Sequence, residues 1–548
     1  TTTTTTPPTL DGKRSSRNGT RESTQEFNML FVKLFAKAYA PYVLLPILLF
    51  SLFALSTTYS IRISTLRSSL DNSPELWGAT ILSIVSTFTL LYYKLKPLPV
   101  YLVDFAAFRP DDSLKLGTNL CAQITRARQS CTPRNMVFQL KVLLKSGLGD
   151  DVYGPPYVTR YTSGEEITQK HPNYNDTIDE MDLMMFGALD ELLLKTGIDP
   201  RQIDYLFVNV CMFYPSPSLT SHLVNRYKMR EDVKTYNLSG MGCAAGMVAL
   251  DLAKDLLRLN KDKFAVLVGT ENITSTMYGG NDRSMLVTNC LFRCGSYALL
   301  LSNKAKDRKR SKFELLGSFR TTTAASDTSY NVIYSREDEH GFLGTSLSIE
   351  LLNVASKALT LSIMKLIPDF MPFTELLKMA VNTIQRKVFK MKKKTYSLDF
   401  KKAFAHFCIH PGGKAILEGV GKSLALSDHD LEPTKMTLYR FGNTSSSGLW
   451  YVMAYCEAKE RLKKGDKVWQ VALGSGFKCN SVVWKVLRDV KPLRGFNPWM
   501  DFIDQYPVDV PDTIGPSHKH YAFLKEMEEE LKRVEADEKL QQQQHQQQ

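Results

Sequence analysis

The sequence predicts an α/β fold made of two related halves, and two observations support that prediction. First, near-continuous apolar runs alternate with helical patterns from about residue 98 onward. Such runs indicate strands that are buried on both faces of a parallel or mixed sheet. Second, residues 253–269 and 458–474 align without a gap as helix end, basic turn, apolar strand and glycine. This match indicates an internal repeat.

The individual elements follow from residue spacing. Apolar residues at intervals of three or four predict helices, and short apolar runs rich in β-branched and aromatic residues predict strands. The predicted strands are 204–213, 263–270, 402–410 and 467–477, and the predicted helices are 179–197, 244–260, 449–465 and about 520–540.

Two uncharged apolar stretches precede the α/β region. Residues 42–59 and 76–93 approach the ~20 residues needed to span a bilayer. A buried core helix is the alternative, whereas a signal peptide does not explain two runs so far from the start. Lysine and arginine flank the pair on its outer sides, which predicts a transmembrane hairpin over 36–97 with the bulk of the protein in the cytosol.

The two ends of the chain are compositionally biased. Residues 1–35 are predicted to be disordered, and residues 496–548 are predicted to hold a charged helix followed by a Gln-rich tail. The chain carries 69 Lys and Arg against 56 Asp and Glu. This balance suits phosphate-bearing ligands or anionic membranes. Nucleic acid is not an expected partner, because no zinc-finger or helix-turn-helix signature is present.

Cysteine usage favours reduced thiols. The nine cysteines are scattered and include no C-x-x-C pair, which argues against a disulfide framework or a zinc site. One of them, Cys243, lies in “NLSGMGCAAG” (237–246), directly before the helix predicted over 244–260. Glycines there permit a sharp turn, and a helix N-terminus stabilises a thiolate or an oxyanion. Packing of small residues explains this motif equally well.

Two later motifs supply possible partners. “HFCIHPGG” (406–413) ends a predicted strand at His410, and His406 would lie on the same face. A structural histidine is the alternative, and a metal site lacks a third ligand. Asn443 lies in “RFGNTSSSG” (440–448), where helix capping is the favoured alternative for this motif alone. Together, Cys243, His410 and Asn443 form an acyl-transfer set compatible with hydrolysis, proteolysis or condensation.

A family resemblance narrows this choice. The chain resembles the plant-type 3-ketoacyl-CoA synthases, the condensing enzymes of very-long-chain fatty acid elongation. The matching stretches include “PVYLVDFA” (99–106), “SGLGDDVYGPP” (146–156), “FYPSPSL” (213–219), “YNLSGMGCAAG” (236–246), “GNDRSML” (280–286), “HFCIHPGGKAILE” (406–418), “RFGNTSSSG” (440–448) and “GSGFKCNS” (474–481). The resemblance implies a duplicated thiolase-like fold with two βαβαβαββ halves, here 98–310 and 311–495.

The resemblance also implies a reaction. Cys243 takes the acyl group of a long-chain acyl-CoA, and malonyl-CoA then loses CO2 to give an enolate that attacks it. His410 and Asn443 would stabilise the enolate oxygen, and we also include His406 among the candidate catalytic residues. The backbone of Gly474, Ser475 and Gly476 would contact the acyl carbonyl. No metal or redox cofactor is expected.

The implied setting is the endoplasmic reticulum membrane, with the catalytic domain facing the cytosol. The expected partners are membrane lipid, a second copy of the chain as a homodimer, and the ketoacyl-CoA reductase, dehydratase and enoyl reductase of the elongase complex. A papain-like protease and a soluble polyketide synthase remain as alternatives, but the predicted hairpin argues against both.

The sequence departs from the family at several positions. Thr322 and Tyr439 stand where the family usually has histidine, Ser296 and Tyr297 add bulk to a Gly/Ala-rich stretch, and Ala106 replaces a common cysteine. These departures leave a weakly active or non-catalytic elongase partner as an alternative. Separately, an apolar stretch beside a Lys/Arg cluster within 361–402 suits a cytosolic membrane surface. A helical cap with a solvated charged face is the equal alternative there.

Overall fold

The computed structural model describes residues 97–127, 131–159, 173–392, 394–510 and 519–546, together with the helical positions 82, 83, 85 and 86. The predicted disordered segment 1–35 and almost all of the predicted transmembrane hairpin therefore lie outside the described residues.

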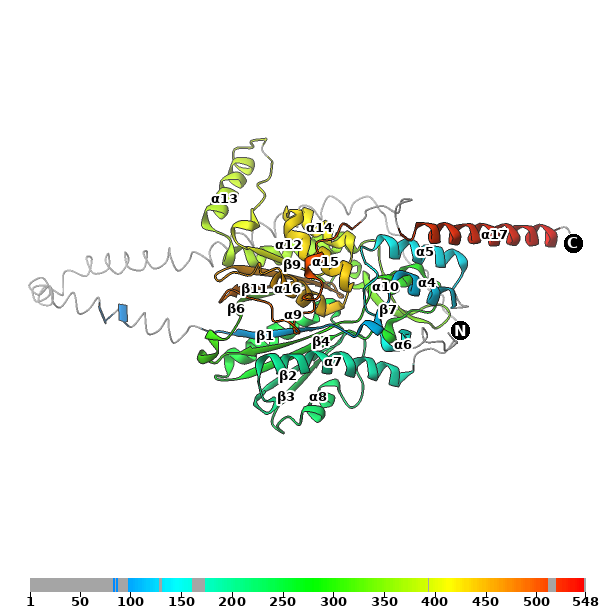
Figure 1. Cartoon of the computed structure of the whole chain (residues 1–548). Coiled ribbons are helices and arrows are strands. Elements are labelled where there is room, and N and C mark those ends of the chain that lie inside the picture. The colour runs from blue at the N-terminus through cyan, green and yellow to red at the C-terminus, as the bar shows by residue number, and fades with distance from the viewer. Residues whose placement is uncertain are drawn as a thin grey trace, which may run out of the picture. The chain divides into compact units, whose positions relative to one another are not determined.

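A mixed β-sheet organises the described residues (Figure 1). Nine strands pair in the order β3-β2-β4-β5-β1-β6-β11-β10-β9, and β7 and β8 form a separate hairpin. The strands are β1 (Tyr101–Phe108), β2 (Tyr205–Asn209), β3 (Lys234–Leu238), β4 (Phe264–Thr270), β5 (Ser296–Ser302), β6 (Phe313–Thr322), β7 (Ile333–Glu337), β8 (Leu343–Leu347), β9 (His406–Ile409), β10 (Lys467–Gly474) and β11 (Lys478–Val486).

The sheet is duplicated in the way the repeat predicts. In one half β2 runs parallel to β4, and β4, β5 and β1 follow in antiparallel pairs. In the other half β9 runs parallel to β10, and β10, β11 and β6 are again antiparallel. The halves meet where β1 pairs with β6. Residues 253–269 and 458–474 lead into β4 and β10, which occupy matching places, so the predicted repeat is confirmed.

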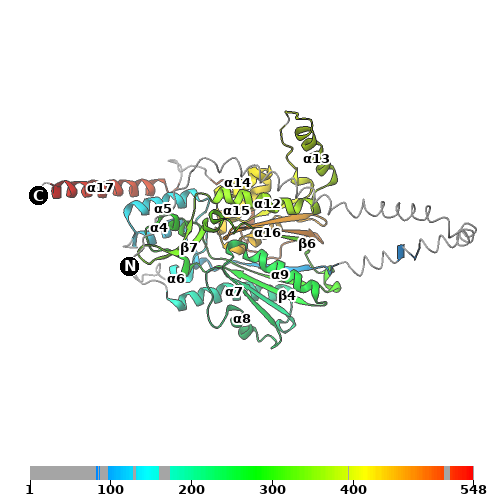
Figure 2. The same ribbon diagram turned by 180° about the vertical axis from the view of Figure 1, so that it is seen from behind.

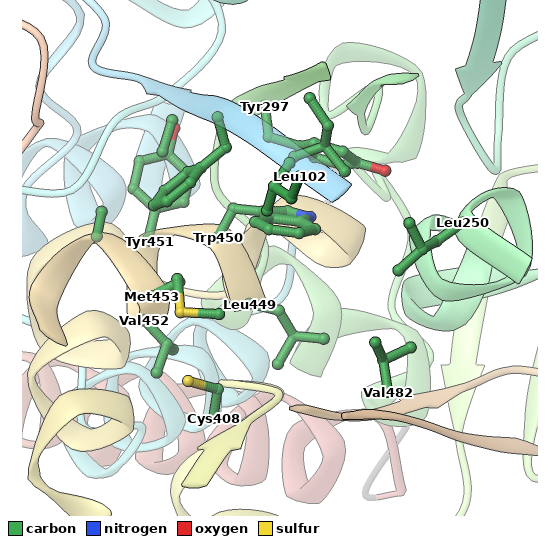
Figure 3. Packing of buried hydrophobic residues seen from close by; sticks show 14 of the residues in the cluster. Leu102, Leu250, Tyr297, Cys408, Leu449, Trp450, Tyr451, Val452, Met453 and Val482 are labelled. Atoms are coloured by element: carbon green, nitrogen blue, oxygen red, sulfur yellow. The ribbon is translucent and has the colours of Figure 1, made fainter. Parts of the chain in front are cut away.

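Two central helices contact strands of both halves. The helix α9 (Ala245–Leu259) packs against β2, β4, β6 and β11, and α16 (Gly448–Ala458) packs against β1, β9 and β10. Their apolar side chains meet in one large core, in which Leu250 and Trp450 lie near Leu102 and Val482 (Figure 3). Since each central helix is buried by both halves, its N-terminus lies inside the protein.

Other helices cover the outer faces. In both views α7 (Tyr174–Thr196) and α8 (Leu219–Tyr227) lie on one side of the sheet, and α12, α14 and α15 lie on the other (Figure 2). The remaining bounds are α4 (Thr118–Ala127), α5 (Pro133–Lys145), α6 (Pro156–Thr159), α10 (Arg283–Leu291), α11 (Asp327–Asn331), α12 (Leu351–Phe370), α13 (Phe373–Lys387), α14 (Lys414–Leu424), α15 (Asp428–Phe441) and α17 (Tyr521–Gln546).

Several predicted boundaries differ from the structure. The strands predicted over 204–213, 402–410 and 467–477 are shorter, as β2 (Tyr205–Asn209), β9 (His406–Ile409) and β10 (Lys467–Gly474). The helix α16 ends at Ala458 rather than at 465, because Glu460 adopts a left-handed φ of 52° that terminates the helix. The helix α7 begins five residues earlier than predicted, at a capping box formed by Asn173 and Asp176. The main core extends past the boundary predicted at 495, since Trp499 is completely buried within it.

Within the described residues, α12 alone is long and apolar enough to cross a membrane. Its buried face also fits a helix that covers a sheet. Ala355, Ala358 and Leu359 are buried, and the Ser362 hydroxyl lies 3.0 Å from that of Ser481 on β11. The apolar composition of α12 is therefore weak evidence for a membrane span.

Candidate active site

The predicted site residues converge on one cavity between the two halves. This cavity has a volume of about 560 Å³, and Cys243, His410, Asn443, Ser475 and Gly476 all line it. They come from a turn before α9, the end of β9, the end of α15 and the β10–β11 turn. Convergence of residues more than 200 positions apart follows from the duplicated sheet, which brings equivalent strand ends together.

Glycine allows the Cys243 turn to pack directly on the β10–β11 turn. Gly242 has a φ of +59°, and a Cβ built on it would lie 2.6 Å from the backbone nitrogen of Ser475. A Cβ on Gly474 would lie 2.6 Å from the backbone nitrogen of Ala244. Both contacts are too short for any side chain, so the two turns meet backbone to backbone as the glycine pattern predicts. Gly474 supports the cavity in this way, although it does not line it.

The Cys243 thiol is protonated at rest. Burial raises its pKa to about 12, with a smaller contribution from the neighbouring Glu271 carboxylate, although a hydrogen bond with Ser445 lowers it. Cys243 is the middle residue of a short 3-10 turn (Gly242–Ala244) that leads into α9. The lowered thiol pKa expected at a helix N-terminus is not found, because the cost of burying a charge outweighs the helix field.

His410 is held as a neutral imidazole. The residue is 3% exposed, and burial lowers its pKa to about 4. Its backbone nitrogen donates to the Val471 carbonyl at 2.9 Å, which fixes the residue beside β10. Within the described residues, its Nδ1 has no hydrogen-bond partner. The residue lines the cavity, and a neutral imidazole there is suited to exchange a proton with a ligand.

Gly412 creates the space for this ring. A Cβ built on Gly412 would lie 3.0 Å from Cδ2 and 3.2 Å from Nε2 of His410. The Gly412 carbonyl also accepts a hydrogen bond from Nδ2 of Asn443 at 3.2 Å. One small residue thus sets the positions of both the imidazole and the amide.

Asn443 serves two purposes at once. Its Oδ1 accepts a hydrogen bond from the Ser445 backbone N–H at 2.9 Å, which caps the 3-10 turn Ser445–Ser447 from one residue before the N-cap position Thr444. Its backbone is pinned by Leu291 and Arg293, with N–H···O distances of 3.1 and 3.0 Å. An amide nitrogen carries two hydrogens, so Nδ2 keeps one donor beyond its bond to Gly412. Capping and donation toward the cavity are therefore compatible.

A buried carboxyl that the sequence prediction missed completes the site. Glu271 lines the cavity directly after β4, and burial raises its pKa to about 7. Its Oε2 accepts from the Ser445 hydroxyl at 2.9 Å, and its Oε1 accepts from the backbone N–H groups of Cys211 and Met212. The sequence signal for this residue was an acidic side chain directly after a completely buried strand.

The structure separates His406 from the other candidates. It begins β9, does not line the cavity, and its Nε2 lies 3.0 Å from an Asp466 carboxylate oxygen. Four residues of extended chain, about 13 Å, separate it from His410. The geometry therefore supports the structural alternative for His406, as the hydrogen-bond partner of Asp466.

The positions at which this sequence departs from the family also lie away from the cavity lining. Thr322 pairs with Lys478 at the end of β6, and the ring of Tyr439 packs against Tyr506. Tyr297 fits in the core because its hydroxyl donates to Asn209 at 2.6 Å and its ring approaches Gly269, where a Cβ would lie 2.1 Å away. These substitutions leave the cavity lining unchanged.

The thiols and carboxylates form no metal centre in the described part of the chain. All nine cysteines are free there, and no three His, Cys, Asp or Glu side chains are grouped to hold an ion.

Comparisons with known proteins agree with this geometry. The profile described as “FAE1/Type III polyketide synthase-like protein” matches residues 92–388, and “Chalcone and stilbene synthases, C-terminal domain” matches residues 348–488. The Arabidopsis thaliana 3-ketoacyl-CoA synthase 11 is 47% identical over 438 residues, which cover 80% of this chain and 85% of the relative. The 3-ketoacyl-CoA synthase 2 of the same plant is 46% identical over 437 residues, which cover 78% and 80%.

Solved structures confirm the thiolase-like fold. A type III pentaketide synthase from Neurospora crassa superposes with a TM-score of 0.56 at 16% identity, over 71% of this chain and 99% of that one. The fungal type III polyketide synthase ORAS gives a TM-score of 0.53 at 17% identity, with the same coverage. The chain therefore belongs to the 3-ketoacyl-CoA synthase family, among the FAE1/type III polyketide synthase-like proteins.

Proposed function

We propose that this protein is a 3-ketoacyl-CoA synthase that joins a malonyl-CoA-derived unit to a long-chain acyl group held on Cys243. One observation carries the proposal: Cys243, His410 and Asn443 line one cavity whose walls are otherwise largely apolar. A nucleophile, a neutral base and a neutral amide donor are the groups that a thioester condensation requires.

In the first step the thiol attacks the acyl-CoA carbonyl. Because the pKa of Cys243 is about 12 and that of His410 is about 4, the resting pair is thiol and imidazole. The imidazole accepts the thiol proton as the S–C bond forms, then returns it to the departing CoA sulfur. The products are an acyl-cysteine and CoA–SH, and His410 is neutral again.

In the second step the malonyl-CoA C–C bond to the carboxylate breaks. CO2 leaves, and the electron pair moves into an enolate whose oxygen accepts hydrogen bonds from His410 and Asn443. The enolate carbon attacks the acyl-cysteine carbonyl, a C–C bond forms, and the cysteine sulfur leaves as a thiolate. That thiolate takes up one proton, so the net products are 3-oxoacyl-CoA, CoA and CO2. Each donor contributes ~10²–10³-fold to the rate.

The remaining cavity wall suits an acyl chain. Apolar side chains from β7, β8, α12 and α14 line it, namely Ile333, Leu343, Leu347, Leu351 and Ile416. Such a wall binds methylene groups without requiring polar partners. The backbone around Ser475 and Gly476 lines the same cavity, where it would contact the acyl carbonyl.

The cellular setting belongs to the same proposal. We assign the protein to the endoplasmic reticulum membrane with its catalytic domain in the cytosol, and to a homodimer. The product, a 3-oxoacyl-CoA, is the substrate of a ketoacyl-CoA reductase, whose product passes to a dehydratase and an enoyl reductase. These three enzymes are the partners expected in an elongase complex.

The test uses membranes containing the full-length chain, labelled malonyl-CoA and acyl-CoAs of several lengths. Labelled 3-oxoacyl-CoA should form with wild type and vanish in Cys243→Ala. The matched control is Cys211→Ala, because Cys211 also lines the cavity and its pKa is likewise raised to about 12. Labelled acyl groups should be found on the Cys243 peptide in both wild type and the control.

Absence of product at every chain length would overturn the proposal. Restored elongation upon co-expression with another synthase would then favour the non-catalytic partner. No placement of Thr322 or Tyr439 favours that second function, since neither side chain reaches the cavity lining.

A further inference from the structure

The helix α13 presents an apolar stripe to the solvent. Leu377, Val381, Ile384 and Val388 are 51%, 44%, 49% and 67% exposed, and their spacing of four, three and four residues puts them on one face. Phe389 and Met391, which follow, are 69% and 45% exposed. Contiguous exposed apolar surface of this kind marks an interaction site rather than ordinary surface.

The opposite face of α13 is firmly attached to the protein. Glu375 is completely buried and accepts hydrogen bonds from the Tyr396 hydroxyl at 2.6 Å and from Lys402 at 2.5 Å. Asn382 accepts from the Tyr396 backbone N–H at 3.0 Å and donates to the Lys394 carbonyl at 3.2 Å. These bonds hold the helix in place without any contribution from the stripe, and α13 stands clear of the sheet in both views (Figures 1 and 2).

Positive charge surrounds the stripe. Residues 376–398 contain seven Lys and Arg and no Asp or Glu. Arg386, Lys390, Lys392 and Lys394 are all exposed, at the C-terminal end of the helix and in the segment after it. A helix with a charged side, an exposed apolar side and flanking lysines has the composition of one that lies in the headgroup region of a membrane.

We propose that α13, residues 388–392 and Lys394 form a membrane-binding surface that inserts its apolar stripe into an anionic lipid bilayer. Apolar side chains enter the acyl boundary, and the lysines contact lipid phosphates. A second copy of the chain fits less well, because two such surfaces would bring like charges together. This surface is separate from the catalytic cavity, so the proposal stands independently of the proposed reaction.

The experiment places an environment-sensitive fluorescent amino acid at Val381 of the full chain. The matched control carries the same probe at Leu194, which is 74% exposed on α7, on the opposite side of the sheet. Both proteins are reconstituted in vesicles of phosphatidylcholine, alone or mixed with phosphatidylserine. We expect a blue shift and protection from aqueous iodide at Val381, stronger with phosphatidylserine, and neither effect at Leu194.

Two sets of variants make the test specific. Replacing Lys390, Lys392 and Lys394 with Gln should lower the ratio of inserted to exposed probe about fivefold per lysine in anionic vesicles. Leu377→Gln with Ile384→Gln should abolish protection and leave thermal stability unchanged, because neither side chain contributes to the bonds that attach the helix.

Two results would overturn the proposal. The first is a Val381 probe that iodide quenches as readily as the Leu194 probe in every vesicle. The second is protection from iodide that does not depend on phosphatidylserine or on the lysine substitutions but rises with the density of protein in the vesicle. That result would indicate that a second copy of the chain covers the stripe. The Val381 probe should show the same protection in the Cys243→Ala variant, which lacks the nucleophile. Failure of catalysis and failure of membrane insertion are therefore distinguishable.

Discussion

Gly412→Ala tests whether the position of His410 limits the reaction. The added methyl group would lie 3.0 Å from Cδ2 and 3.2 Å from Nε2 of the imidazole. Carbon contacts are most favourable at about 3.5–4.0 Å, so the ring must move by about 0.5 Å. Since a misplacement of 1 Å costs about 10²-fold, half that displacement should lower kcat about tenfold. The variant backbone is unstrained, because Gly412 lies outside the left-handed region.

The matched control is Gly419→Ala, seven residues further along. A Cβ there would meet Cδ2 of Leu352 at 3.5 Å, an ordinary contact. The assay measures kcat and KM for 3-oxoacyl-CoA formation and the thermal midpoint of each variant. We expect lower kcat only in Gly412→Ala, with KM and the thermal midpoint near wild type. Wild-type kcat in Gly412→Ala, or an equal loss in Gly419→Ala, would refute the steric reasoning.

Three further changes probe the donor, the buried carboxyl and the core. Asn443→Ala should slow condensation ~10²–10³-fold and leave the acylation of Cys243 by labelled acyl-CoA intact. An equal loss of rate in both steps would count against a role of Asn443 in stabilising the enolate. Burial raises the Glu271 pKa from 4.5 to about 7, so its protonated form is favoured in the folded state. The free energy of unfolding of wild type should therefore fall by about 3 kcal/mol relative to that of Glu271→Gln as pH rises from 4.5 to 7. Denaturant unfolding measures this difference, and parallel curves of stability against pH for the two proteins would contradict the prediction. Lys312→Met should lower the free energy of unfolding in urea by about 3–5 kcal/mol, because it leaves buried Glu457 without the ammonium 2.8 Å away, whereas Asp104 keeps Lys195 at 3.3 Å. A loss below about 1 kcal/mol would exclude that account.

Strand positions and the duplication could be predicted because both depend on local pattern. β4 and β10 are buried on both faces, which requires the continuous apolar runs seen in the sequence. The end of α16 was mispredicted because amphipathic spacing continues past Ala458, whereas the helix stops where Glu460 adopts a left-handed conformation. Helical periodicity in a sequence indicates that a helix can form, whereas the residue at which the helix ends depends on tertiary packing.

The site could be predicted where close contact between backbone segments allows only glycine. Gly242 and Gly474 are required by contacts that exclude any Cβ, so the glycine pattern pointed to close packing around Cys243. The link between Glu271 and Ser445 could not be predicted, since it joins residues 174 positions apart through one hydrogen bond. The raised pKa of Cys243 could not be predicted either, because it depends on burial that appears only after both halves assemble.

The pKa shifts in the cavity all favour the neutral form of each group, and this explains how a long acyl chain and acid–base groups can occupy the same space. Burial favours the thiol of Cys243, the imidazole of His410 and, near pH 7, a partly protonated Glu271. A resting thiolate–imidazolium pair would have to be desolvated whenever methylene groups entered. A neutral pair avoids that cost and delays charge separation until the thioester carbonyl is in place. On this argument the acyl-binding wall and the shifted pKa values have one common cause, which is exclusion of water from the junction of the two halves.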